Sequence, residues 1–92
     1  MLTYTLWFGA RSLITGGEYE TITFDGREIG SVAYTDGYEN LHYHIYETDQ
    51  GVVIIHLIEK RGYEMISKIF EYSSIDETKE DYELVLSDAG VI

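Results

Sequence analysis

The sequence of 92 residues contains no cysteine and no proline, and only six of its side chains are lysine or arginine. Without cysteine, neither a disulfide nor a thiolate zinc site can stabilise the fold. No apolar run approaches the 18 residues of a membrane span, and the N-terminal segment MLTYTLWFG lacks the basic region of a signal peptide. We therefore expect a protein of the cytoplasm with no membrane contact.

The shortage of basic residues leaves a large negative charge. Seventeen aspartates and glutamates face six lysines and arginines, so the formal net charge is −11. Direct binding of nucleic acid or of an anionic membrane needs a basic surface, so the charge argues against both. Phosphate-binding and dinucleotide-binding glycine motifs are absent from the sequence, and no serine lies in a nucleophile-elbow motif. The sequence predicts no cofactor and gives no support to an enzymatic activity.

The residues that are present suit one folded domain spanning positions 1–92. The hydrophobic fraction is 45% and the aromatic fraction 14%, which is enough to bury a core. Alternating or β-branched segments bounded by glycine predict a sequence of strands. These are Leu2–Phe8, Tyr19–Phe24, Glu28–Tyr34, Leu41–Thr48, Val52–Glu59 and Tyr63–Tyr72.

Glycine-containing pairs predict the connections between these strands. We expect a loop over residues 9–17, a two-residue hairpin at Asp25-Gly26, and a looser connection that Asp36-Gly37 opens. Asp49-Gln50-Gly51 fits a three-residue hairpin loop, and Arg61-Gly62 turns the chain once more. Val52–Glu59 is the most apolar segment, so we expect it to be central and covered on both faces.

The C-terminal segment has the pattern of a helix. Ser74 and Glu77 are spaced as a capping box, and Gly90 stands where a glycine ends a helix. An apolar stripe between them requires a partner surface, and one face of the sheet can supply it. The predicted architecture is α+β: a mostly antiparallel meander of five or six strands with one C-terminal helix packed on a face. The stripe consists of Ile75, Tyr82, Val85, Leu86 and Ala89.

The three histidines form one candidate site. His42 and His44 are two apart on one strand and therefore share a face. A three-residue loop at Asp49-Gln50-Gly51 pairs His44 with His56 and gathers all three imidazoles, which can hold zinc with an open coordination position. A two-residue loop instead sends His56 to the opposite face, because a slip of one residue inverts every side chain. The alternative to a metal site is a set of half-buried histidines paired with tyrosine or glutamate.

The acidic residues form the second candidate site. Neighbours two apart on a strand, or three or four apart on a helix, carry carboxylates at roughly 5–7 Å, which is about two steps of a nucleic-acid strand. Tyr38, in a loop beside Glu39, is the tyrosine we expect to be exposed as an interface anchor. The candidate partner-binding residues are Glu18, Glu20, Asp36, Tyr38, Glu39, Asp76, Glu77, Glu80 and Asp81.

The small, acidic, tyrosine-rich composition without cysteine or proline resembles that of inhibitors encoded by phages and mobile elements, including DNA-mimic anti-restriction and anti-CRISPR proteins. This resemblance implies a non-catalytic module that occupies the basic nucleic-acid groove of a host protein or nucleoprotein complex. A three-histidine metal-binding enzyme or sensor is one alternative. The other is a structural module that forms a homodimer through an exposed strand edge, either Leu2–Phe8 or Tyr63–Tyr72.

Overall fold

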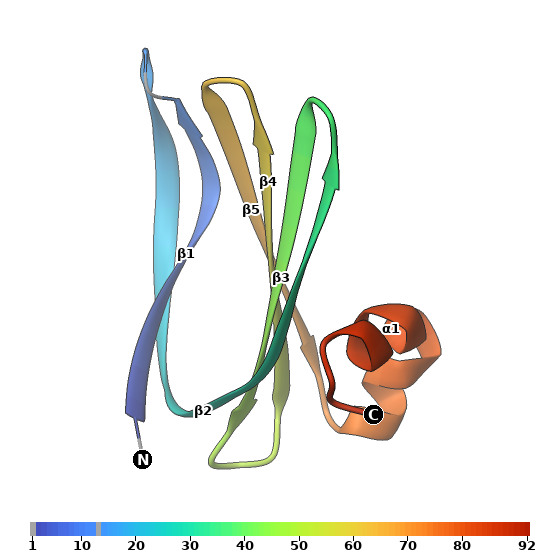
Figure 1. Ribbon diagram of the computed structural model, residues 1–92. Helices are drawn as coiled ribbons and strands as arrows, with labels where there is room; N and C mark the ends of the chain where they lie inside the picture. Colours follow the sequence, from blue (N-terminus) through green and yellow to red (C-terminus); the bar gives the residue numbers. More distant parts are fainter. Residues whose placement is uncertain (1, 13) are drawn as a thin grey trace.

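The computed structural model describes residues 2–12 and 14–92 as a small antiparallel β-barrel followed by one helix (Figure 1). The predicted α+β meander with a C-terminal helix is confirmed, and the number of strands is five. The elements are β1 (Leu2–Ser12), β2 (Gly16–Asp36), β3 (Glu39–Thr48), β4 (Val53–Arg61), β5 (Glu64–Tyr72) and α1 (Ile75–Asp88).

Each strand pairs with the next in antiparallel fashion, and a short pairing of β1 with β5 closes the barrel. This last pairing joins only four residues of each strand, from Gly9 opposite Ser67 to Ser12 opposite Glu64. The turns that connect β1 to β2, β2 to β3 and β4 to β5 all lie at the end of the barrel that is uppermost in Figure 1. The helix lies at the side of the lower half.

The predicted hairpin at Asp25-Gly26 is wrong, because β2 runs through this pair without interruption. Gly26 is paired with Leu2 of β1 on one side and with Thr48 of β3 on the other. A Cβ atom at position 26 would lie only 2.3 Å from the backbone oxygen of Glu47. The glycine therefore permits a close approach of two strands where β2 passes from one partner to the next. It does not make a turn.

Two other predicted connections are shorter than expected. The loop predicted over residues 9–17 is replaced by paired strands up to Ser12 and from Gly16 onward. Gly17 again allows close approach, because a Cβ there would lie 2.2 Å from the backbone oxygen of Ala10. The Asp36-Gly37 connection is a tight turn, since Asp36 is already paired with Glu39.

The alternation along the central strands separates two cores. Leu6, Tyr46 and Ile54 are buried inside the barrel, where Tyr4 and Phe24 pack against them. The opposite side chains of the same strands point outward and are covered by α1. This second core contains Ile45, Val53, Ile55 and Leu86, each with no exposed surface. β4 is therefore covered on both faces, as its apolar sequence predicts.

The helix is held to the barrel by the predicted stripe. Tyr82, Val85 and Ala89 pack against the outer core around Leu86. Ser74 caps the N-terminus by accepting a hydrogen bond from the backbone N–H of Glu77, 3.1 Å away. The Glu77 carboxylate accepts from the backbone N–H of Ser73 and not from that of Ser74, so only half of the predicted capping box forms. Among the described residues, no helix is both long and apolar enough to cross a membrane.

Candidate protein-binding surface

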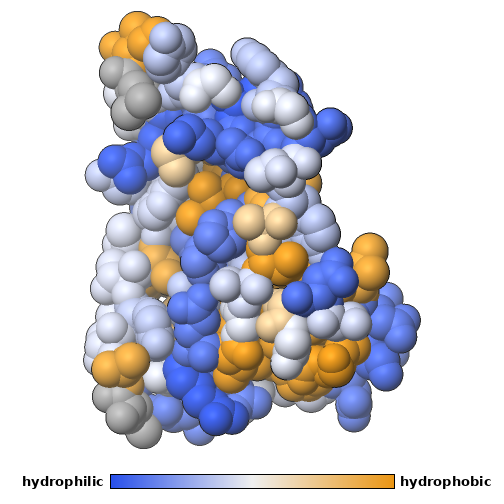
Figure 2. All heavy atoms as spheres, in the orientation of Figure 1, coloured by the Kyte–Doolittle hydropathy of each residue, from blue (hydrophilic) through white to orange (hydrophobic). Residues whose placement is uncertain are grey.

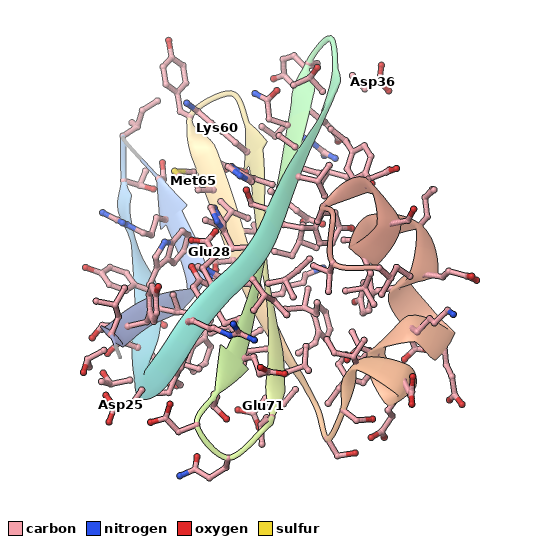
Figure 3. The ribbon with its side chains drawn as sticks, turned by 60° about the horizontal axis from the view of Figure 1, so that its bottom comes forward. Asp25, Glu28, Asp36, Lys60, Met65 and Glu71 are labelled. Carbon is pink, nitrogen blue, oxygen red and sulfur yellow. The ribbon has the colours of Figure 1, made fainter. Side chains whose placement is uncertain are left out.

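The predicted acidic residues lie in three separate places. Glu18 and Glu20 are at the beginning of β2, and Asp36 and Glu39 flank the turn between β2 and β3. Figure 3 shows Asp36 at one end of the molecule, whereas Asp25 and Glu71 lie near the other end. The third group is on α1, beside the lower half of the barrel, and consists of Asp76, Glu77, Glu80 and Asp81.

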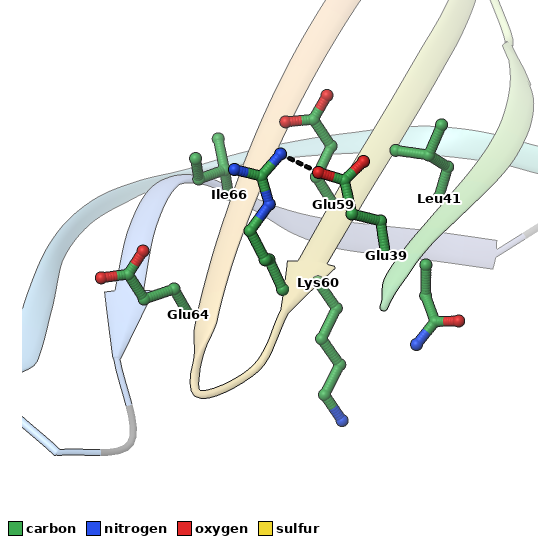
Figure 4. Close-up of a pocket in the computed structure, with 8 residues that line it drawn as sticks. Glu39, Leu41, Glu59, Lys60, Glu64 and Ile66 are labelled. Carbon is green, nitrogen blue, oxygen red and sulfur yellow. Dashed lines mark hydrogen bonds and ion pairs between the residues drawn. The ribbon is translucent and has the colours of Figure 1, made fainter. Parts of the chain in front are cut away.

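Acidic residues on the barrel are partly neutralised by basic neighbours. Arg61 forms an ion pair with Glu39, and Arg27 forms one with Glu47 at 3.2 Å. The Arg61–Glu39 pair lies in a small pocket at the beginning of β3, the end of β4 and the beginning of β5, and the dashed line in Figure 4 that ends on Glu39 marks this ion pair. Both acidic and basic side chains line this pocket, so it does not present charge of one sign. Its lining consists of Glu39, Asn40, Leu41, Glu59, Lys60, Arg61, Glu64 and Ile66.

The helix has a much more uniform charge. Its 14 residues include six acids and one base, Lys79. Two of the acids accept hydrogen bonds from tyrosines of the barrel: Asp81 from Tyr72, at 2.9 Å, and Asp88 from Tyr34. Burial together with the Asp81 bond raises the pKa of Tyr72 to about 12. The bond to Asp88 raises that of Tyr34 to about 12 as well, so both tyrosines remain donors at physiological pH.

The other acids of α1 differ in whether their carboxylates form hydrogen bonds with the rest of the protein. Glu77 is bound to Ser73 at the N-terminus of the helix. In the described part of the chain, Asp76, Glu80 and Glu83 make no side-chain hydrogen bond or ion pair, and all three are exposed. Sequence reasoning did not select Glu83, which lies just after Tyr82, where a φ of −129° and a ψ of 35° kink the helix.

An exposed apolar side chain stands among these carboxylates. Leu84 is 70% exposed, and Ile92 at the C-terminus is 48% exposed. Both line a shallow hollow on the outer side of α1, together with Glu80 and Glu83. In Figure 2 the part of the surface over α1 is mostly hydrophilic, with hydrophobic residues among the hydrophilic ones. Sequence analysis missed Leu84 because it lies outside the apolar stripe.

The histidines gather on one face, as the three-residue loop predicts. Gly51 has a φ of +82°, and His44 is paired with His56. The rings of His42 and His44 stack with centroids 4.0 Å apart, and those of His44 and His56 lie 6.3 Å apart. His44 Nδ1 is 2.8 Å from the Glu28 carboxylate, which projects from β2. Figure 3 places Glu28 in the middle of the molecule, over the barrel.

His56 is the most buried of the three. Its Nε2 lies 2.9 Å from the backbone oxygen of Trp7 and 2.6 Å from Ser67 Oγ, and the Ser67 hydroxyl also donates to the Trp7 oxygen. A carbonyl oxygen can only accept, so Nε2 carries the proton of the neutral ring. Burial lowers the pKa of His56 and that of His42, and the neighbouring His44 lowers both further. Within residues 2–12 and 14–92, no three histidine, aspartate or glutamate side chains have the arrangement of a metal site.

Tyr38 is 72% exposed in the turn between β2 and β3, as predicted from its position. It lies at the opposite end of the barrel from the N-terminus of α1, so the two parts of the predicted surface are not continuous. Comparison with protein-family models, curated proteins and solved structures found no match for the chain.

Proposed function

We propose that this protein is an acidic protein-binding module that uses the outer side of α1 to occupy a basic, nucleic-acid-binding surface of another protein. The observation that carries the proposal is the charge of α1: six acids and one base on a helix whose orientation is fixed by a fully buried Leu86. Packing of the inner stripe keeps the exposed carboxylates on a rigid surface, so little conformational freedom is lost when a partner binds.

The arrangement of the free carboxylates supports a partner that normally binds phosphates. Asp76 and Glu80 are four residues apart in the regular first part of α1, which places their side chains about 5–6 Å apart. Glu83 follows Tyr82, where the backbone leaves the helical conformation, and adds a further exposed carboxylate beyond this kink. Lysine and arginine side chains in a nucleic-acid groove match a row of negative groups at such intervals. Bound there, the module excludes nucleic acid without catalysis, in the manner of the phage and mobile-element inhibitors that its composition resembles.

Two charge-reversed variants of equal net charge test the proposal. One carries Asp76→Lys, Glu80→Lys and Glu83→Lys on α1, and the other carries Glu18→Lys, Glu20→Lys and Asp36→Lys at the far end of the barrel. Each immobilised protein is incubated with host lysate at low and at high salt, and the proteins that the wild type captures at low salt are identified. The identified partner is then titrated with each variant and with duplex DNA as competitor.

We expect the α1 variant to lose affinity for the partner, because salt-sensitive binding depends on these carboxylates. The barrel variant has the same net charge and should retain binding, and duplex DNA should displace the wild-type protein. Equal loss in both variants would mean that net charge alone drives association. A partner that binds the α1 variant as well as the wild type would show that this surface is not the interface.

A further inference from the structure

The barrel has an opening between β1 and β5. The first seven residues of β1, from Leu2 to Phe8, are paired with β2 alone, and residues 68–72 of β5 are paired with β4 alone. Figure 1 shows the two strands diverging below their short pairing, with β5 bending toward the helix. Two strand edges therefore border this opening. On the β1 edge the backbone oxygen of Trp7 already accepts a hydrogen bond from the Ser67 hydroxyl, so the part that can pair with a further strand is Leu2–Leu6.

The two edges differ in how they are protected. The β5 edge carries Lys68 and Glu71, and charged side chains are a common protection of exposed strand edges. The β1 edge, LTYTLWF, has no charged residue and no proline, and it is rich in residues that favour strands. An unprotected edge of this kind is a template for pairing with another extended segment.

The opening leads to an apolar hollow. Phe8 of β1, Ile22 of β2 and Ile69 of β5 line it, and the exposed Glu71 lies at its border. A strand added to β1 directs alternate side chains toward this hollow and the others toward solvent. Apolar side chains at the inward positions suit its lining, and a basic side chain near Glu71 meets a carboxylate.

We propose that the β1 edge, over Leu2–Leu6, binds an extended segment of the basic partner, which adds to the barrel as a further strand. This proposal rests on the proposed function, because it takes the basic partner as the source of the added strand. The other candidate is a second copy of this chain, and charge distinguishes the two. A second copy brings another net charge of −11, whereas a segment with lysine or arginine at alternate positions is attracted to this chain. The helix and the β1 edge are then two contacts with one partner.

Synthetic peptides test strand addition without any change to the protein. The first is a seven-residue peptide of alternating lysine and valine. The second has the same sequence with N-methyl groups on alternate backbone nitrogens, which removes hydrogen-bond donors and keeps the charge. The third replaces lysine with glutamate. Binding is followed by the fluorescence of Trp7, which is the only tryptophan and lies in β1, and by the shifts of backbone amide resonances.

We expect the first peptide to shift the amide resonances of residues 2–8 and 68–72. The N-methylated peptide should bind at least about tenfold more weakly, since it lacks backbone donors that pairing with β1 requires. The glutamate peptide should not bind.

Equal binding of both lysine peptides, or shifts confined to α1, would overturn strand addition and leave the proposed function standing. Concentration-dependent shifts of residues 2–8 without peptide would overturn it in favour of a second copy. If no basic peptide binds at any site at low salt, strand addition fails, and the charge-reversed variants of α1 decide the proposed function separately.

Discussion

At the scale of single residues, the side chains of His56 and Ser67 form hydrogen bonds to β1 at a position where its backbone pairing with β5 has ended. The pairing between β1 and β5 ends at Gly9 and Ser67, which leaves the backbone oxygen of Trp7 without a strand partner on that side. The Ser67 hydroxyl donates to this oxygen at 2.7 Å, and His56 Nε2 lies 2.9 Å from it. Side chains thus satisfy a backbone group that would be costly to bury alone.

Ser67→Ala should lower the free energy of unfolding by about 1 kcal/mol, because it removes one hydrogen bond in a buried setting while His56 still donates to Trp7. For a domain of this size, the expected fall in Tm is roughly 5 °C. Calorimetry of Ser67→Ala beside Ser31→Ala, a change at an exposed strand position, measures the difference. Equal Tm values for the two variants would contradict the structural role of Ser67.

Protonation of His56 should make the fold sensitive to acid. Burial keeps the pKa of His56 in the folded protein below its ordinary value of 6.5. As the pH falls below about 6.5 the unfolded chain therefore takes up the proton first, and stability is lost as the pH decreases. The loss is on the order of 1 kcal/mol per pH unit until the folded pKa is reached.

Urea unfolding at pH 7.5 and at pH 5.5 measures this loss. His56→Gln keeps an amide group that can donate to Trp7 but cannot gain a charge, so its free energy of unfolding should change less between the two pH values than that of the wild type. A variant that keeps the full pH dependence would assign the effect to other groups, such as His42, whose pKa is also lowered.

At the scale of elements, β2 is the long strand that joins the β1 side of the barrel to the β3 side. Its first half is paired with β1 and its second half with β3, and Gly26 is the position where one pairing gives way to the other. Gly26→Ala should destabilise the fold by about 2 kcal/mol or more, because the new methyl group would overlap the backbone of β3. Chemical unfolding of this variant beside Ser31→Ala checks the prediction, and a stability equal to that of the control would show that β2 can shift away from β3.

The same strand shows what the sequence could and could not predict. The register of β3 and β4 follows from local information, since alternation and the glycine at position 51 fix both the faces and the loop. The helix follows from Ser74, the apolar stripe and Gly90. An Asp-Gly pair at positions 25 and 26 has the sequence of a turn, but the role of this glycine depends on the backbone of β3, which is distant in sequence. Closure of the barrel through β1 and β5 is likewise a long-range property.

The candidate site was predictable only in part, for the same reason. The acids of α1 are evident from their sequence spacing. Which of them are held by the barrel depends on Tyr72 and Tyr34, whose hydroxyl groups reach Asp81 and Asp88 from other elements. Only the folded arrangement distinguishes these two carboxylates from Asp76 and Glu80.

At the scale of the whole molecule, the distribution of charge suits binding of a basic partner but lowers the stability of the fold. The barrel carries five of the six basic residues, and three of them form ion pairs with its acids. The helix has one basic residue, and Glu80 follows Glu77 by three residues and Asp76 by four. Like charges at these spacings destabilise a helix by about 0.2–0.5 kcal/mol per pair, so a surface suited to a basic partner is also a source of repulsion.

Glu80→Gln should therefore stabilise the isolated protein by about 0.5–1 kcal/mol at low salt, since it removes both repulsive pairs and retains a good helix-forming residue. Salt screens the same repulsion, so the gain should shrink as the salt concentration rises. The variant should also bind the basic partner more weakly, with a smaller dependence on salt.

Urea unfolding at two salt concentrations and titration of the partner measure the two effects. Glu18→Gln, at the far end of the barrel, is the matched control. A gain in stability without any loss of affinity would separate the repulsion on α1 from its proposed role in binding.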